Sequence, residues 1–316
     1  MIYKTREIPK KLLGLTALNN RIEPKHKLKE KIKKELSKVK AGYGGEMNFD
    51  KHLLEYIPEY PHAILHDISL KQDGIFFQMD SLLITPSSIL IFEVKNIAGK
   101  LLFMQNPDRF VRQWSTGETQ PMQSPVAQLD RKKYFFSKWL TERGIHVPIK
   151  SVVVLAYSNE IQPVTIPNIH ITFAYQIPYY LNSLTLKDAQ INEKTIGNLA
   201  FEMKNNHQEY DPFPMIRRWN ISQTDIQSGV QCLSCKLFGM RWYLKKWNCP
   251  RCGEIGLDNH IAAVNDWFYL IDRKMTNSQF RRFMFIEDQH VAKRLLKKSG
   301  LDLRGRRKGC YYIMKE

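Results

Sequence analysis

The stretch QMDSLLITPSSILIFEVK, residues 78–95, constrains the fold more than any other part of the chain. Two apolar runs rich in β-forming residues flank Thr-Pro-Ser-Ser, whose proline stands at the second turn position. Each run also carries acidic residues, although the interior of a strand is normally apolar. The sequence therefore predicts a tight β-hairpin with charged side chains built into it.

The charged residues of this hairpin are expected to share one face. In a hairpin closed symmetrically about Pro86–Ser87, Asp80 lies opposite Glu93, and Lys95 shares their face because side chains alternate along a strand. Val94 points the other way, into the core. Two like charges at cross-strand distance are destabilising unless a cation lies between them, which indicates a metal site. The alternative is a solvent-exposed ladder of ion pairs formed by the same three side chains.

Asp80, Glu93 and Lys95 have the spacing and the hairpin setting of the PD-(D/E)xK nuclease motif, and FFQMDSLLITPSSILIFEVKNIAGKL resembles the NERD (nuclease-related) domain. Three further blocks agree with the family pattern in order: GGEMNFDKHL at 44–53, Arg109 to Trp114, and SPVAQL at 124–129. The last block has Ser124 where asparagine is usual. The resemblance covers roughly residues 40–157.

This resemblance implies a restriction-endonuclease-like α/β fold, with a mixed sheet flanked by helices. It also implies a catalytic metal site in which Asp80, Glu93 and the backbone carbonyl of Val94 bind Mg²⁺ or Mn²⁺. The metal would activate water and neutralise charge on the scissile phosphate. Lys95 would orient that water or stabilise the transition state.

Two further residues have both a structural and a catalytic interpretation. Glu46 lies in the first turn of a predicted helix, where its charge is favourable, while the resemblance implies an acidic group at the active site. Gln128 lies on a helix predicted over 123–143 and resembles the glutamine of the Q-x-x-x-Y element of several nuclease relatives. It would position water or substrate. Tyr134 does not have the standard spacing from Gln128 and is expected to be structural.

Four of the five cysteines form two CxxC pairs, Cys232 with Cys235 and Cys249 with Cys252, separated by thirteen residues. This spacing is typical of zinc ribbons, in which four thiolates surround Zn²⁺. Four protein ligands leave no open position, so the predicted zinc is structural. Basic and aromatic residues between the pairs suit nucleic acid, although surface solubility and a small core explain them almost as well. Cys310 is expected to be a half-buried thiol.

The charge of the chain favours a polyanionic partner. The net charge is +17 and the pI about 9.6, which points to nucleic acid ahead of a membrane surface. No apolar stretch approaches the length of a membrane-spanning helix, and the first residues lack the apolar core of a signal peptide. We therefore expect a cytoplasmic protein without a membrane partner, and DNA is favoured over RNA.

The chain divides by pattern into five parts. They are a basic N-terminal helical arm at 1–40, a NERD-like nuclease domain at 41–210, a linker at 211–229, a zinc-ribbon module at 230–256 and a basic helical C-terminal domain at 257–316. The glycine-rich residues 41–45 are expected to form a joint before the helix of the nuclease domain. The C-terminal domain has three short helical patterns, a basic turn and a strand, which are compatible with a winged-helix-like unit.

The predicted function is metal-dependent hydrolysis of phosphodiester bonds in DNA, with endonuclease action favoured. The zinc ribbon and the basic C-terminal region would aid nucleic-acid binding. One alternative is a catalytically silent binding or regulatory protein that keeps the nuclease fold, and another is an RNA-directed nuclease with the same residue assignments. Many enzymes of this fold class dimerise to cut both strands, so a homodimer is a further expectation.

Overall fold

The computed structural model describes residues 1–104, 109–162, 169–184 and 188–315. The chain forms two compact units, one made of Met1–Ile8 and Lys40–Tyr210 and the other of Pro9–Val39 and Asp211–Glu316. Residues 9–39 and 211–229 thus both contribute to the second unit.

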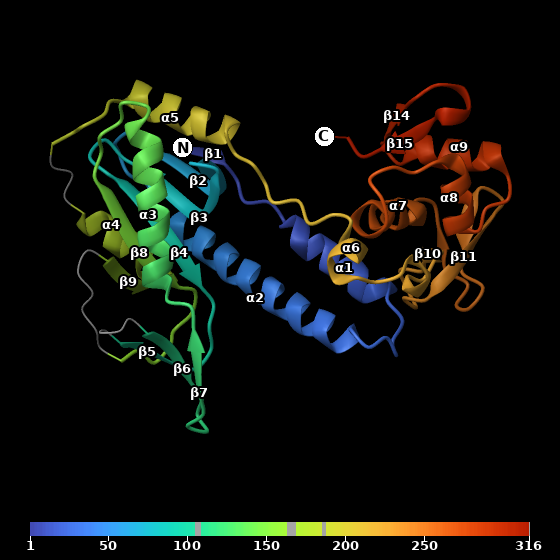
Figure 1. The fold of residues 1–316 in the computed structure, drawn as a ribbon, viewed down its shortest axis with the longest axis horizontal. Helices are drawn as coiled ribbons and strands as arrows, with labels where there is room; N and C mark the ends of the chain where they lie inside the picture. Colours follow the sequence, from blue (N-terminus) through green and yellow to red (C-terminus); the bar gives the residue numbers. More distant parts are fainter. Residues whose placement is uncertain (105–108, 163–168, 185–187, 316) are drawn as a thin grey trace. The chain divides into compact units, whose positions relative to one another are not determined.

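A six-stranded mixed sheet forms the centre of the first unit, in the order β1-β2-β3-β4-β8-β9. Strand β3 runs antiparallel to both of its neighbours, β2 and β4, whereas the β1/β2, β4/β8 and β8/β9 pairs are parallel. The strands span Ile2–Lys4, Ala63–Gln72, Ile75–Ile84, Ile89–Lys95, Ile149–Leu155 and Ile169–Phe173 in that order. Helices α3 (Pro125–Thr141) and α5 (Glu193–Asn205) pack on one face, and α4 (Ile177–Ser183) with the end of α2 (Lys29–Leu53) packs on the other (Figure 1). This is the mixed sheet flanked by helices that the sequence predicts.

The β3–β4 hairpin has the predicted register from its turn to the pair Ser81 and Phe92. Thr85 and Ser88 close the turn, since the Thr85 amide donates to the Ser88 carbonyl at 2.9 Å. The ladder stops one pair short of Asp80 and Glu93, however. Before this point, Phe77 and Met79 of β3 pack in the core cluster that contains α3, whereas after it Leu82 and Ile84 do so. The regular alternation of side chains, on which the predicted pairing of Asp80 with Glu93 depends, is therefore interrupted.

Side-chain alternation along β4 places the charged residues on the α3 face. Ile89 and Ile91 pack in the core cluster that contains α3 residues, whereas Leu90, Phe92 and Val94 pack in the cluster on the opposite face. Val94 therefore points into the core, as predicted, and Glu93 lies on the side of α3.

Helix α2 (Lys29–Leu53) is continuous, so the expected joint at 41–45 is wrong. A Cβ atom on Gly45 would lie 2.6 Å from the Cβ of Asn96 and 3.1 Å from that of Ala156. This glycine is therefore needed for close packing of the helix on the sheet, and that packing offsets its low helix propensity. None of the helices in the described residues combines the length and apolar character needed to cross a lipid bilayer.

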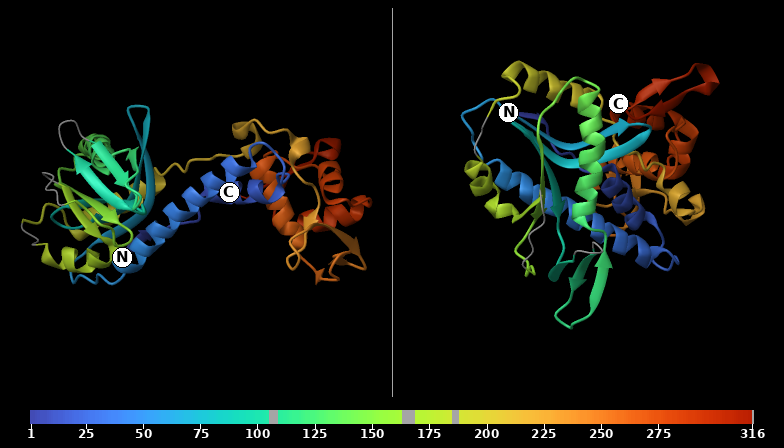
Figure 2. Two further views of the ribbon diagram at one scale, coloured as in Figure 1. Left: turned by 90° about the horizontal axis from the view of Figure 1, so that it is seen from below. Right: turned by 60° about the vertical axis from the view of Figure 1, so that its left-hand side comes forward.

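The first unit also contains a separate three-stranded antiparallel sheet. Its strands are β5 (Lys100–Met104), β6 (Arg109–Gln113) and β7 (Thr119–Met122). Figure 2 shows these strands next to the first turns of α3, which follows β7 in the chain. Short 3₁₀ helices occur in the two units at Ala174–Gln176, Gln223–Asp225 and Arg307–Gly309.

The second unit contains a four-stranded sheet, β10-β11-β12-β13, whose turns carry the cysteine pairs. The strands span Val230–Gln231, Phe238–Tyr243, Lys246–Asn248 and Ile255–Gly256. Helix α1 (Lys10–Arg21) and the short α6 (Met215–Trp219) pack in the same unit. The buried Arg21 guanidinium binds Asp266 through an Nε–Oδ2 contact of 2.6 Å and donates to the Gln227 carbonyl, which links α1 to the rest of the unit.

The C-terminal part of this unit has the order of elements of a winged helix. Helices α7 (Asn259–Leu270), α8 (Asn277–Met284) and α9 (Gln289–Lys298) precede a hairpin of β14 (Asp302–Arg304) and β15 (Tyr311–Ile313). Between α7 and α8, Met275 forms a β-bridge with Tyr312 of the hairpin. Asp288 caps α9 through the amides of His290 and Val291, which fixes where that helix begins.

Candidate active site

The residues of the predicted triad lie near one another at the end of β4. Glu93 Oε1 accepts a hydrogen bond from Lys95 Nζ at 2.6 Å, and the same ammonium donates to Gln128 Oε1 on α3 at 2.6 Å. Asp80 Oδ2 accepts from the backbone amide of Val94 at 2.9 Å. Asp80 is 9% exposed and Glu93 3% exposed, which excludes the solvent-exposed ladder of ion pairs.

Lys132, which the sequence reasoning missed, bridges the two carboxylates. Its Nζ lies 3.2 Å from Asp80 Oδ1 and also donates to Glu93 Oε2. The side chain of Lys132 is 14% exposed. Lys132 follows Gln128 by one helical turn, so it occupies the tyrosine position of the Q-x-x-x-Y spacing. The Q-x-x-x-Y spacing from Gln128 is the sequence signal from which a functional residue at position 132 could have been predicted.

The carboxylates and the ammonium groups of this cluster favour each other's charged forms. Burial alone would raise the pKa of Asp80, but the Lys132 and Lys95 ammonium groups and the Val94 amide lower it below its ordinary value. Burial likewise opposes the charged form of Lys132, yet Asp80 and Glu93 raise its pKa. Asp80 and Lys132 are therefore both ionised near neutral pH.

The donor set fits a divalent cation. Asp80 and Glu93 direct carboxylate oxygens at one shared cation, the Lys132 ammonium, and such oxygens are the ligands that Mg²⁺ and Mn²⁺ prefer. Within the described ranges, no third carboxylate or imidazole joins this pair with all ligand atoms within 4.8 Å of one another. A metal here would therefore take its remaining ligands from backbone, water or substrate.

Glu46 belongs to a neighbouring cluster organised by Arg6, a residue that the sequence reasoning also missed. The Arg6 side chain is 1% exposed and contacts the carboxylates of Asp50 at 2.7 Å, Glu46 at 2.9 Å and Asp67 at 2.7 Å. It also donates to the Asp80 carbonyl at 3.0 Å. Burial and the charge of Asp80 raise the pKa of Glu46 to about 8. Arg6 thus couples Glu46 to the backbone of the candidate metal ligand.

His66 lies in the same cluster. Its Nδ1 is 2.8 Å from Ser81 Oγ and 3.2 Å from Asp50 Oδ1. The next residue, Asp67, has a φ of 50°, a strained conformation for a non-glycine residue in a strand. Burial lowers the pKa of His66 to about 4. The imidazole is neutral at physiological pH and holds Ser81 beside Asp80.

An open cavity of about 740 Å³ begins directly after Lys95. It is lined by residues 96–100, 113–115, 117 and 157–160. Trp114 and Tyr157 both line this cavity and are partly exposed, at 37% and 53%. The Arg112 guanidinium lies 3.8 Å from the centre of the Trp114 ring. The lining of this cavity thus begins at Asn96, the residue that follows Lys95 in the chain.

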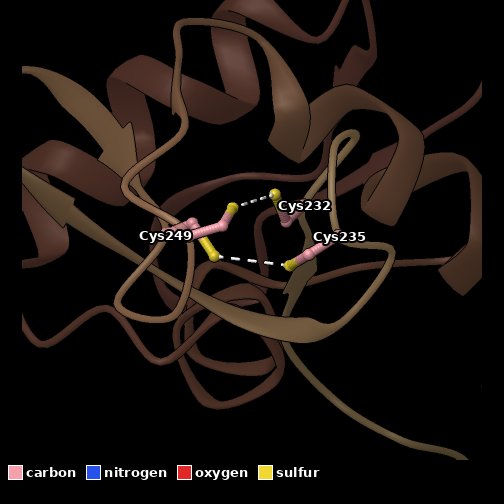
Figure 3. A group of neighbouring side chains, drawn as sticks. Cys232, Cys235 and Cys249 are labelled. Carbon is pink, nitrogen blue, oxygen red and sulfur yellow. Dashed lines mark hydrogen bonds between the residues drawn. The ribbon is translucent and has the colours of Figure 1, made fainter.

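The four cysteines of the CxxC pairs form a second candidate metal centre. Their sulfur atoms all lie within 4.8 Å of one another, and the side chains labelled in Figure 3 point toward a common centre. Cys232 Sγ lies 3.5 Å from Cys252 Sγ, and Cys235 Sγ lies 3.7 Å from Cys249 Sγ. Tetrahedral zinc, with Zn–S bonds of about 2.3 Å, separates its sulfur ligands by about 3.8 Å. The cluster therefore fits a zinc-ribbon module.

A basic surface covers α9 and the following hairpin. Apolar residues of α9 are buried, whereas Lys293, Arg294 and Lys297 are exposed. Arg306 and Arg307, in the turn between β14 and β15, are exposed as well. Helix and hairpin thus both present cations to solvent.

Residues 41–156 match the family model described as "Nuclease-related domain" (NERD). No curated protein and no solved structure matches the chain. The matched region contains Asp80, Glu93, Lys95, Gln128 and Lys132. The first unit therefore contains a nuclease-related domain, and the second adds a cysteine cluster compatible with a zinc ribbon.

Proposed function

We propose that the protein is a metal-dependent nuclease that hydrolyses phosphodiester bonds in DNA. The observation that carries this proposal is the buried pair Asp80 and Glu93, which shares one cation and lies beside the Lys95 ammonium. Burying two carboxylates is costly without a compensating cation, and this region matches a nuclease-related domain.

The contacts and the resemblance to the nuclease family support a proposed role for each residue. Asp80 and Glu93, with the backbone carbonyl of Val94, would hold Mg²⁺ or Mn²⁺. A metal held by these residues would supply an acidified water and would neutralise charge on the scissile phosphate. Lys95 provides a second positive charge for the phosphate, and Gln128 fixes the position of that ammonium. Glu46 would act from its contact with Arg6, as a proton-holding group near Asp80.

The second unit would contribute to nucleic-acid binding. The exposed cations of α9 and the hairpin turn have the arrangement of a helix and wing that grip DNA phosphates. The net charge of +17 supports the same partner class. The four-cysteine module would hold a structural zinc that fixes the turns of the four-stranded sheet β10–β13. We extend the proposal to a cytoplasmic endonuclease that acts on both strands as a homodimer.

Cleavage of supercoiled plasmid tests the proposal. Purified protein would be incubated with Mg²⁺, Mn²⁺ or EDTA, beside Asp80→Asn and Lys95→Met, with Asp73→Asn as a control because Asp73 forms an exposed ion pair with Lys138. We expect metal-dependent nicking that both site variants lose and the control retains. Single-stranded DNA and RNA substrates in parallel identify the preferred nucleic acid. Binding without cleavage under every condition would contradict the proposal.

One observation favours a catalytically silent binding protein as the second candidate. The Lys132 ammonium by itself offers a compensating positive charge to both Asp80 and Glu93. A domain that had lost catalysis could keep the same carboxylates as part of a structural ion-pair network. The plasmid assay separates the two, since a silent protein would shift DNA mobility without nicking it.

A further inference from the structure

Lys132 is anchored at its backbone but carries its charge on a flexible side chain. Helix α3 is fixed on the sheet by residues on either side of Lys132, since Leu129 and Phe136 are fully buried. The lysine ammonium, by contrast, sits at the end of a four-carbon stem with several rotatable bonds. The group can therefore leave the carboxylates by side-chain rotation while the helix stays in place.

The position of this ammonium coincides with the position that the proposed metal needs. It contacts Oδ1 of Asp80 and Oε2 of Glu93, one oxygen from each carboxylate. An ammonium and a divalent cation between the same two carboxylates would repel each other strongly in a site shielded from water. Only one of the two can occupy it at a time.

We propose that Lys132 is a built-in counter-cation that holds the two carboxylates together in the metal-free protein and is displaced when the divalent ion binds, so that it sets the metal affinity of the site. This inference rests on the proposed function, because it concerns the same metal. The displaced ammonium stays tethered to α3 beside the site, where the phosphate of a bound nucleic acid is the complementary anion. Metal binding would then convert Lys132 from a carboxylate partner to a substrate partner.

The test measures Mn²⁺ binding directly. Titration of the full chain, followed by the electron paramagnetic resonance signal of free Mn²⁺, would compare the native protein with Lys132→Met. Lys138→Met is the matched control, because Lys138 lies on the same helix and pairs with Asp73 at the surface. Asp80→Asn with Glu93→Gln gives the background from sites elsewhere in the chain.

We expect Lys132→Met to bind Mn²⁺ at least about tenfold more tightly than the native protein, a factor that corresponds to about 1.4 kcal/mol. Lys138→Met should bind as the native protein does. Equal or weaker binding by Lys132→Met would overturn the inference, because the lysine would then not compete with the metal.

Lys132→Met could fold poorly, because its two buried carboxylates have lost their cation. Thermal unfolding with and without Mn²⁺ tests the proposal in that case. We expect the variant to unfold at a lower temperature than the native protein without metal, and Mn²⁺ to raise its midpoint by more than it raises the native midpoint. A variant that Mn²⁺ does not stabilise at any concentration would overturn the inference, because the ion is required to replace the ammonium.

The two proposals fail in distinguishable ways. If the native protein cleaves DNA but Lys132→Met and native protein bind Mn²⁺ equally, the inference about Lys132 is wrong and the nuclease function stands. If Lys132→Met binds Mn²⁺ more tightly but neither protein cleaves nucleic acid, the displacement holds and the nuclease function is wrong.

Discussion

The side chain of Asp80 accepts a hydrogen bond from the backbone amide of Val94 at 2.9 Å. This bond lies one step beyond the last regular pair of the β3–β4 ladder, so a carboxylate takes the place of a backbone acceptor. The contact fixes Asp80 against the strand residue between Glu93 and Lys95. The charged groups of the site are thereby held by the sheet itself, which is the preorganisation that catalysis requires.

Replacement of Gln128 should slow the chemical step. Gln128→Ala removes the acceptor that lies 2.6 Å from Lys95 Nζ, and a loosened catalytic group costs about 10- to 100-fold in rate. We expect single-turnover plasmid cleavage to fall by that factor while the Kd for DNA is unchanged. Asp130→Ala, an exposed position on the same helix, is the control. A Gln128→Ala protein that cleaves at the native rate would show that Lys95 is positioned without it.

Replacement of Arg6 should destabilise the first unit. Arg6→Met leaves Asp50, Glu46 and Asp67 without their common cation, and breaking a buried ion pair costs about 3–5 kcal/mol. Hydrogen exchange of the β2–β4 amides in urea would measure the loss. Lys138→Met breaks an exposed pair instead, so its effect should stay within about 0.5 kcal/mol. Similar losses of stability in the two variants would show that Arg6 stabilises the first unit no more than an exposed ion pair does.

Acid should weaken the first unit through His66. Burial lowers the pKa of His66 from its ordinary 6.5 to about 4, so the unfolded chain takes up this proton more readily than the folded one. The stabilising contribution is therefore full above pH 6.5 and is lost as the pH falls toward 4, at about 1.4 kcal/mol per pH unit. Urea unfolding of native protein and His66→Asn at pH 7 and pH 5 measures it. The native protein should lose more stability than the variant, and parallel losses would contradict the prediction.

Removal of one cysteine ligand should release zinc. Cys249→Ser breaks the group of four sulfurs, whereas Cys310→Ser changes a cysteine that lies outside that group. We expect one zinc per chain, measured by elemental analysis, in the native protein and in Cys310→Ser, and a loss of that zinc with a lowered unfolding temperature in Cys249→Ser. Retention of full zinc content by Cys249→Ser would mean that the metal is bound elsewhere.

The exposed cations of α9 should contribute to DNA affinity without sequence preference. Arg294→Ala with Lys297→Ala removes two phosphate partners, so the logarithmic salt dependence of binding should become shallower by about 2. Fluorescence anisotropy with a labelled duplex at several salt concentrations measures this slope. Lys204→Ala with Lys194→Ala removes the same charge from α5 in the first unit and is the control. Equal slopes for the two double variants would show that the cations of α9 contribute no more to DNA binding than those of α5.

Local signals account for the parts of the structure that the sequence predicts correctly. Two β-forming runs around Pro86 define the hairpin and most of its register, because turn chemistry and side-chain alternation act over a few residues. The cysteine spacing predicts the cluster for the same reason. Both depend on contacts within a short segment, so they are visible without knowledge of the fold.

The residues that sequence reasoning missed act over long distances. Arg6 lies 74 positions from Asp80 and Lys132 lies 39 positions from Glu93. Ion pairs of this kind have no periodicity in the sequence. The spacing from Gln128 indicates position 132, but a lysine there does not match the tyrosine of that element and is one of many lysines in this chain. The expected joint at 41–45 failed for a related reason: the helix propensity of glycine is local, whereas the packing of Gly45 on Asn96 is set by the sheet.

Arg6 also determines how this domain can be separated from the rest of the chain. The matched region begins at residue 41, inside α2 and well after Arg6, so a fragment cut at that boundary would leave three carboxylates around an empty position. It would also remove strand β1, which pairs with β2. The region that matches the family model is therefore shorter than the compact unit that contains it, which also includes Met1–Ile8. Any transplant of this domain into another protein must carry the N-terminal strand and its arginine with it.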